Sequence, residues 1–236
     1  MIEESDITYM RTLIYVPIIH TSADLGSLAV DVTKRGVADL GKDAWREHIK
    51  TVNRFWDAIS FYFDSMEVSG MKIYQDGMVA GGEIGEKIVE EGVMARSKNY
   101  DLISRLLKRG AILVKTEDFN LVKEERDRLF AIIKARSIIQ KLIALMNFKI
   151  VKNRLLNKRD KFISERINET LDQDETGIIF IGACHNLKEK LSKSIQIKEI
   201  KDPDKVKEYQ KLLPFYNKHK QRFEELAEYL VSEMEA

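Results

Sequence analysis

The sequence contains a single cysteine, Cys184, and only three prolines among 236 residues. One cysteine cannot form an intrachain disulfide, which is compatible with a reducing compartment, and we therefore expect a cytoplasmic protein. The first ten residues, MIEESDITYM, are acidic where a signal peptide needs a positive region followed by an apolar core. Because prolines are scarce, long uninterrupted helices are permitted.

The chain also lacks a long hydrophobic run and an excess of charge of one sign. No segment reaches the roughly 18 apolar residues needed to cross a bilayer, so we expect no membrane span. The 39 basic and 38 acidic residues leave a formal net charge of +1, which gives no reason to expect nucleic acid as a partner. With 44% hydrophobic and 33% charged residues, the composition is typical of a globular protein.

Four short apolar runs are typical of strands that are buried on both faces. They are rich in β-branched and aliphatic residues without polar alternation, which favours a mostly parallel sheet. A weaker fifth run alternates in polarity and indicates an edge strand. We therefore expect an α/β fold with a central sheet of about 4–6 strands flanked by helices. The four runs are residues 13–19, 71–74, 111–115 and 177–184, and the fifth is 194–200.

Helical patterns separate these runs. Apolar residues at three- and four-residue spacing, together with candidate cap residues, predict three helices before the third strand and two at the C-terminus. Asp43 is the predicted N-cap of the first helix, and Ser97 is that of the third, with Gly110 in the C′ position after it. Pro214 divides the two C-terminal helices. The predicted helices cover residues 43–66, 83–91, 98–109, 204–213 and 215–235.

Residues 119–171 contain neither proline nor glycine, and their apolar residues recur at helical spacing. A single helix of this length would be unusual beside a mean of about 12 residues. We therefore expect two or three helices, arranged as an antiparallel hairpin that projects from the sheet, with a break near Asn147 or Asn157. The whole chain, residues 1–236, is then one α/β domain with residues 119–171 inserted as a long helical segment before the last GxxH strand.

A histidine or a carboxylate follows each of the four buried runs. His20, Asp76, Glu117 and His185 come shortly after the first, second, third and fourth run. Because ligands of open α/β sheets bind beyond the carboxyl ends of the strands, we expect these side chains to share one rim. Two imidazoles with one or two carboxylates are a usual ligand set for a divalent metal ion. The same groups could also act as general acids and bases without a metal.

Other polar features receive simpler interpretations. His48 and His219 fall inside charged helices and are expected at the surface. Cys184 is expected to be a buried, inert thiol, since adjacent side chains of a strand point to opposite faces. The glycine-rich residues 77–85 and the basic residues 149–161 could together attract a phosphate group. A plain loop and a solvated helical face are the simpler interpretations of these two segments.

Two consecutive segments in the second half of the chain resemble a known pattern. The first, RDKFISERINETL, begins with Arg159 and Asp160, and the second, GIIFIGACHNL, contains Gly182 and His185 in a GxxH arrangement. They resemble the C-terminal half of the TraB/Tiki superfamily, which includes the TraB/PrgY, Tiki/GumN, erythromycin-esterase-like and ChaN-like proteins. In that superfamily an Arg-Asn or Arg-Asp pair opens a helix, and an apolar strand ending in GxxH follows.

The start of the chain extends the resemblance and also departs from it. The first strand of the superfamily ends in GxxH, and here Pro17 stands in place of the glycine that precedes His20. The second strand of the superfamily ends in a glutamate, and here the shorter Asp76 occupies that position. The resemblance therefore implies a divergent member with an α/β fold.

The resemblance implies a metal-dependent hydrolase but does not give its substrate, and our hypothesis is that it acts on a peptide, an ester or a similar small polar bond. A zinc, manganese or cobalt ion would be held by His20, Asp76 and His185, and Asp76 would also orient the attacking water. Glu117 would be the general base, and Arg159 would bind an anionic group or stabilise negative charge in the transition state.

Two alternatives remain open from the sequence. A non-enzymatic ligand-binding or signalling protein would use the same cleft for a small-molecule or peptide ligand. Its long helices would then dock a partner or join two copies of the chain in a homo-oligomer. A phosphate ester or nucleotide bound at the glycine-rich residues 77–85 and the basic residues 149–161 is the other alternative.

Overall fold

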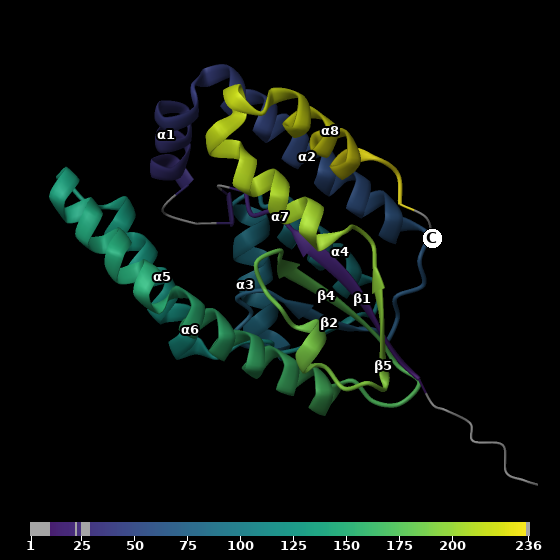
Figure 1. Cartoon of the computed structure of the whole chain (residues 1–236). Coiled ribbons are helices and arrows are strands. Elements are labelled where there is room, and N and C mark those ends of the chain that lie inside the picture. Colours follow the sequence, from purple (N-terminus) through teal and green to yellow (C-terminus); the bar gives the residue numbers. More distant parts are fainter. Residues whose placement is uncertain (1–9, 22, 25–28, 235–236) are drawn as a thin grey trace, which may run out of the picture.

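The computed structural model of the chain describes residues 10–21, 23–24 and 29–234. Its centre is a five-stranded sheet with parallel pairing throughout, in the order β3-β2-β4-β1-β5 (Figure 1). This arrangement confirms the predicted α/β fold. The strands are β1 (Arg11–Ile18), β2 (Lys72–Gln75), β3 (Ile112–Leu113), β4 (Thr176–Gly182) and β5 (Ile195–Glu199).

Each of the five predicted apolar runs forms a strand, and the weaker fifth run lies at the edge of the sheet as expected. β1 lies inside the sheet, where a proline normally removes a ladder hydrogen bond. Pro17 is tolerated because alternate residues of β1, such as Arg11, direct their backbone N–H toward β5. The pairing of β5 with β1 ends at Tyr15. A residue at position 17 therefore needs no backbone N–H to pair with β5, and proline fits there.

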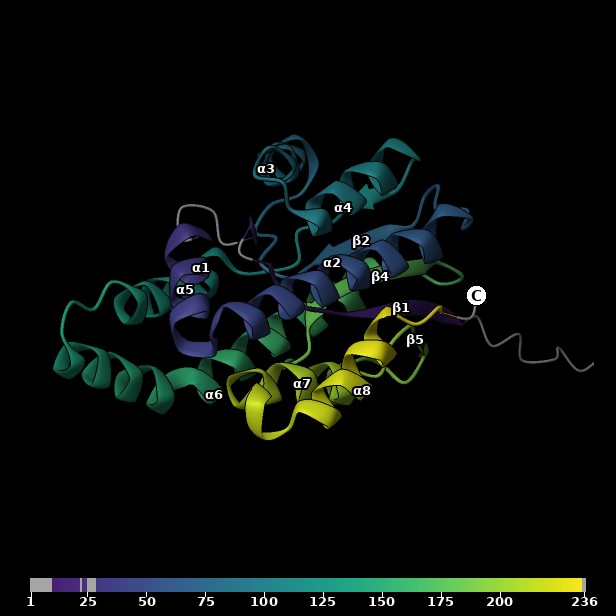
Figure 2. The ribbon, with the colours of Figure 1, turned by 90° about the horizontal axis from the view of Figure 1, so that it is seen from above.

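Helices cover both faces of this sheet (Figure 2). Phe55 and Trp56 of α2, together with buried side chains of α3, α4, α7 and α8, pack on one face. Ile163 and Ile167 of α6 pack on the other. The helices are α1 (Ala29–Leu40), α2 (Lys42–Asp64), α3 (Gly82–Met94), α4 (Lys98–Lys108), α5 (Phe119–Ile133), α6 (Ile138–Thr170), α7 (Pro203–Leu212) and α8 (Lys220–Val231), with short 3-10 segments at Lys188–Lys190 and Leu213–Lys218.

The predicted ends of α4 are confirmed, and the predicted start of α2 is wrong. The Ser97 hydroxyl accepts a hydrogen bond from the backbone N–H of Tyr100, and Gly110 has a φ of +90° just after the helix. α2 begins instead after Gly41, which provides no side-chain cap. Asp43 lies within the first turn of α2, where its negative charge still interacts favourably with the helix dipole.

The predicted helical hairpin is present, but its turn is not at either predicted asparagine. α5 and α6 lie side by side, and their joined ends project beyond the sheet (Figures 1 and 2). The turn is at residues 134–137, where the Ser137 hydroxyl accepts a hydrogen bond from the backbone N–H of Gln140 and caps α6. Asn147 and Asn157 are exposed on α6, so their amides remain solvated and do not interrupt the helix. We call α5 and the first half of α6, residues 119–154, the arm.

The C-terminal helices are separated by more than a single proline. α7 ends at Leu212, and Pro214 lies inside the 3-10 segment that precedes α8. The predicted end of the last helix, residue 235, lies outside the described residues. Among the described helices, none combines the length and the apolar character that crossing a membrane requires.

His48 is buried, contrary to the expectation of a surface histidine. Only 8% of the residue is exposed, and its Nδ1 lies 3.0 Å from the hydroxyl of Tyr209 on α7. The histidine ring also stacks on the ring of Tyr209. Burial lowers the pKa of His48 to about 4, so the ring is neutral in the folded protein near neutral pH.

We expect this buried histidine to make the fold sensitive to mild acid. An unfolded histidine has a pKa of about 6.5, so the unfolded chain binds a proton below that pH. The folded chain resists protonation of His48 down to about pH 4, and stability therefore falls as the pH drops through this window. At about pH 5 the loss amounts to about 2 kcal/mol.

Urea unfolding at neutral pH and at about pH 5 measures this loss. The amide of the variant His48→Gln can keep a hydrogen bond to Tyr209. Between the two pH values, the free energy of unfolding of this variant should fall by about 2 kcal/mol less than that of the wild type. His219→Gln is the matched control, because His219 is exposed. Equal losses in the wild type and in His48→Gln would contradict the prediction.

Candidate functional site

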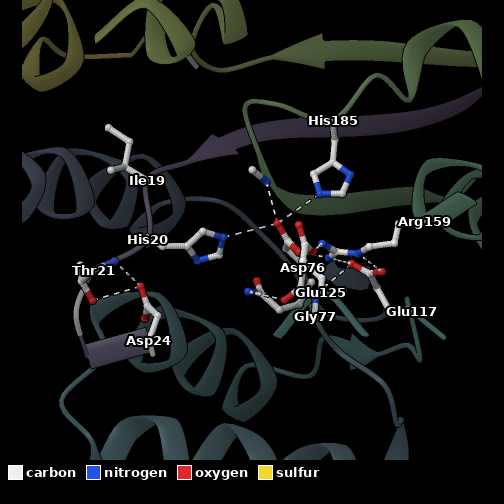
Figure 3. A network of polar contacts seen from close by, with 12 residues as sticks. Ile19, His20, Thr21, Asp24, Asp76, Gly77, Glu117, Glu125, Arg159 and His185 are labelled. Carbon is white, nitrogen blue, oxygen red and sulfur yellow. Dashed lines mark hydrogen bonds and ion pairs between the residues drawn. The ribbon is translucent and has the colours of Figure 1, made fainter. Parts of the chain in front are cut away.

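The carboxyl ends of neighbouring strands bring three predicted residues together. β4 lies between β2 and β1, so His185, which follows β4, lies beside Asp76 and His20. The Oδ2 atom of Asp76 is 3.4 Å from Nε2 of His20 and 3.6 Å from Nε2 of His185 (Figure 3). These two distances limit the separation of the imidazole nitrogens to about 7 Å, so both histidines belong to one site.

Backbone hydrogen bonds hold Asp76 and His185 in these positions. The N–H of Asp76 donates to the carbonyl of Phe180 at 2.8 Å and so extends the pairing of β2 with β4. The N–H of Gly182 donates to Asp76 Oδ2 at 3.0 Å, and the N–H of His185 donates to the Gly182 carbonyl at 3.0 Å. The end of β4 therefore positions both the carboxylate and one imidazole.

Gly182 faces the space in which the three side chains converge. A Cβ atom at this position would lie 3.0 Å from Asp76 Oδ2, 3.6 Å from His185 Cδ2 and 3.9 Å from His20 Nε2. The absence of a side chain thus leaves room among the carboxylate and the two imidazoles. Any larger residue would have to displace the carboxylate of Asp76.

A second carboxylate, Asp160 of α6, orients the ring of His185. Asp160 Oδ1 lies 2.5 Å from His185 Nδ1, and Oδ2 accepts a hydrogen bond from the N–H of Asn186 at 3.0 Å. The Asp160 and His185 side chains are almost fully buried. A carboxylate that accepts from Nδ1–H leaves Nε2 as the free nitrogen, and that nitrogen faces Asp76.

Arg159, the residue before Asp160, connects three carboxylates beneath the rim. Its Nη2 donates to Asp76 Oδ1 at 2.6 Å and its Nε donates to Glu117 Oε2 at 2.9 Å. Nη2 also donates to Glu117 Oε1, and Nη1 donates to Glu125 of α5. Only 7% of the Arg159 side chain is exposed, so these charge-assisted contacts form away from water.

Glu117 lies behind Arg159 rather than on the open side of the site. The residue is fully buried, and Oε1 also accepts a hydrogen bond from the N–H of Gly77 at 3.1 Å. Burial raises the pKa of Glu117 above its usual value, although Arg159 opposes this effect. A general base needs to reach a substrate or a water molecule. The predicted role of Glu117 as a base stays a prediction, while its contacts favour the positioning of Arg159.

His20 is the accessible member of the site. Its side chain is 43% exposed, whereas those of Asp76 and His185 are buried. The indole N–H of Trp56 donates to the carbonyl of Ile19 at 3.2 Å and anchors the backbone just before His20. A ligand that approaches from solvent therefore meets His20 first.

Asp24 holds the residue that follows His20. Its Oδ2 accepts hydrogen bonds from both the N–H and the hydroxyl of Thr21, and its Oδ1 accepts one from the hydroxyl of Ser97 at the start of α4. The contacts with Thr21 are drawn in Figure 3, and the contact with Ser97 connects the end of β1 to the start of α4. They also bring another negative charge close to His20.

The site carries more negative than positive charge. The described network contains one guanidinium, that of Arg159, and five carboxylates, those of Asp24, Asp76, Glu117, Glu125 and Asp160. Burial works to raise the pKa of Asp76, but the two histidines and Arg159 outweigh it and hold the pKa well below its usual range. Asp76 therefore remains ionised.

Both histidines respond to this negative environment. Desolvation works to lower the pKa of His185, but Asp76 and Asp160 outweigh it and raise the pKa above its usual value. The pKa of His20 is raised in the same way, since desolvation is outweighed by Asp76 and Asp24. The site thus attracts positive charge, which a proton or a metal ion could supply.

Sequence reasoning missed two members of this network and misjudged a neighbouring residue. Asp160 was recognised only as part of the Arg-Asp pair, and Glu125 received no role. Cys184 was expected to be buried, but it is exposed, because β4 ends at Gly182 and the chain turns there. The predicted phosphate site at residues 77–85 remains a prediction.

Among the described residues, no group of three or more His, Cys, Asp or Glu side chains is already arranged around a position for a metal ion. The donor types and the excess of negative charge nevertheless fit a divalent cation. No protein-family model, curated protein or solved structure matches the chain. The resemblance to the TraB/Tiki superfamily therefore rests on the residues quoted above.

Proposed function

We propose that His20, Asp76 and His185 bind a divalent cation, and that the protein is a metal-dependent hydrolase of the TraB/Tiki type. The observation that carries the proposal is the approach of two imidazole nitrogens to one carboxylate oxygen, at 3.4 and 3.6 Å. Two ligands of a tetrahedral ion with bonds of about 2.1 Å lie roughly 3.4 Å apart. The two distances between imidazole nitrogen and carboxylate oxygen match that spacing.

The hydrogen bonding of His185 supports the same proposal. Because Asp160 accepts from Nδ1–H, the unprotonated Nε2 of a neutral His185 faces the ionised carboxylate of Asp76. Two acceptors that face each other repel unless a positive charge lies between them. A proton on Nε2 removes this repulsion, and a metal ion held by both groups can take the place of that proton. The carboxylate of Asp160 then strengthens the imidazole as a ligand.

A bound divalent cation would lower the pKa of a coordinated water molecule toward neutrality and so supply a nucleophile. Arg159 fixes Asp76 through its second oxygen, which leaves Oδ2 directed at the histidines. To bind an anionic substrate group, Arg159 would first have to release one of its carboxylates. The substrate would be a peptide, an ester or a similar small polar compound that enters from the side of His20.

One observation favours the alternative of a non-enzymatic ligand-binding or signalling protein. Among the described contacts, both oxygens of Glu117 and all three nitrogens of Arg159 are already engaged. A binding protein does not need a free general base, whereas a hydrolase does. The alternative predicts stoichiometric ion binding without turnover.

Metal analysis of protein purified without a histidine tag tests the proposal. After incubation with zinc, manganese or cobalt and dialysis, we expect one equivalent of bound ion. His20→Ala and His185→Ala should each weaken binding at least about a hundredfold, since both remove a direct ligand. His219→Ala is the control, because it removes an exposed histidine outside the site. Binding should also weaken as the pH falls through the pKa values of the two imidazoles, which the site raises above the usual value of about 6.5, because protons then compete with the ion.

Two results would overturn the metal site: a wild-type chain that binds no stoichiometric ion, or a His20→Ala variant that binds as tightly as the wild type. Hydrolysis of ester and peptide substrates by the loaded protein then separates the two functions. Turnover that disappears in His185→Ala supports the hydrolase. Stoichiometric ion binding with no turnover supports the binding protein.

A further inference from the structure

The first half of α6 exposes large apolar side chains to solvent. Ile138 and Ile150 are 79% and 77% exposed, and Ile139 and Met146 are 71% and 63% exposed. At about 100° per residue, these four residues and Leu142 share one side of the helix. Lys149 and Asn153 fall within the same arc, but five large exposed apolar side chains on one side of a helix still mark an interaction surface rather than ordinary surface variation.

A run of basic residues without acidic neighbours extends from the end of α5 through the turn and into α6. Residues 128–158 contain eight basic residues and no acidic residue, which leaves 31 basic and all 38 acidic residues for the rest of the chain. The near-zero net charge of the whole protein therefore conceals a positive segment at residues 128–158 and a negative remainder of the chain. The eight are Arg128, Lys134, Arg136, Lys141, Lys149, Lys152, Arg154 and Lys158.

The positive charges border the apolar stripe. At about 100° per residue, Lys141 and Lys152 lie along one margin of the stripe and Arg154 lies along the other, while Lys149 lies within it near the lysine margin. An apolar face bordered by lysine and arginine is the pattern of a helix that lies in the interface of a membrane. The arm projects beyond the sheet in both views, so this face can meet a flat surface (Figures 1 and 2).

We propose that the arm binds an anionic lipid bilayer, with the stripe of Ile138, Ile139, Leu142, Met146 and Ile150 inserted among the headgroups. The bordering lysines would contact negatively charged lipids. A second copy of the chain fits less well, because pairing two stripes would bring two basic segments together. Nucleic acid would match the charge but would leave the apolar side chains exposed. This inference does not depend on the proposed metal site.

Sedimentation with vesicles tests the proposal on the whole protein. We expect binding to vesicles of phosphatidylcholine and phosphatidylserine in equal parts, no binding to phosphatidylcholine alone, and weaker binding at high salt. Lys149→Gln combined with Lys152→Gln should weaken binding about fivefold per lysine. The matched control replaces Lys193 and Lys211 in the same way, and it should leave vesicle binding unchanged, because these two exposed lysines lie outside the arm.

A second variant tests the apolar part. Replacing Ile139, Met146 and Ile150 together by serine should reduce vesicle binding at least about tenfold. The control replaces Phe61, Ile84 and Met94 by serine, since these are equally exposed apolar residues on other helices. All six positions are exposed, so circular dichroism should find both variants folded.

Three outcomes would overturn the proposal. The first is the absence of binding to the anionic vesicles, and the second is binding that both arm variants leave unchanged. The third is a different occupant: a dimer in ultracentrifugation that the triple serine variant abolishes, or binding to soluble polyglutamate without binding to vesicles. A dimer would assign the stripe to a second copy, and polyglutamate binding would assign it to an acidic protein segment.

Discussion

The variant Arg159→Met should lower the free energy of unfolding by about 3–5 kcal/mol. Arg159 is buried and forms ion pairs with Asp76, Glu117 and Glu125. Removing the guanidinium leaves Glu117 as a fully buried carboxylate with only the N–H of Gly77 as a described partner. Such an uncompensated buried charge is among the costliest defects that a fold can carry. Urea unfolding monitored by circular dichroism measures the change.

Two further variants define the cause of that loss. Arg154→Met removes an exposed arginine from the same helix and should change stability by less than about 0.5 kcal/mol. Arg159→Lys keeps the charge but not the planar fork that contacts three carboxylates, so we expect an intermediate loss. If Arg159→Met were as stable as Arg154→Met, the ion-pair network would contribute little to the fold.

Trp56→Ala should also lower stability by about 3–5 kcal/mol. Trp56 is fully buried on α2 and packs edge-on against Phe55 in the larger core. Truncation would leave a cavity and would deprive the buried carbonyl of Ile19 of its indole donor. Because that carbonyl precedes His20, the variant should also loosen the accessible histidine of the site.

The matched control for this prediction is Phe61→Ala. Phe61 is an aromatic residue on the same helix, but 72% of it is exposed, so its loss should cost less than about 0.5 kcal/mol. Thermal unfolding of the two variants compares a buried and an exposed ring in one helix. Similar losses for both would contradict the assignment of the effect to core packing, since alanine raises the helix propensity at both positions.

The strands and the rim were predictable because both depend on short-range patterns. Continuous apolar runs identify strands that are covered on both faces, and parallel strands place the residues after them at one edge. The positions of His20, Asp76 and His185 follow from those two rules. The roles of Asp160 and Glu125 do not, because they depend on how α5 and α6 are rotated against the sheet.

Two incorrect predictions had contrary evidence in the sequence. His48 lies three residues after Trp45 and four before Val52, so it shares the apolar side of α2 and not the charged side. The turn between α5 and α6 was assigned to asparagines, yet Ser137 and Gln140 have the spacing of a capping box. In both cases residue type was given more weight than position on the helix.

The contact between Arg159 and Glu125 has a consequence for how the arm and the rim affect each other. Glu125 lies on α5, within the arm, while the same guanidinium holds Asp76 beside the histidines. A displacement of α5 must therefore either break this ion pair or carry Arg159 with it. If binding at the arm changes the affinity of the rim for its ligand by some factor, that ligand must change the affinity of the arm by the same factor, because such coupling is reciprocal.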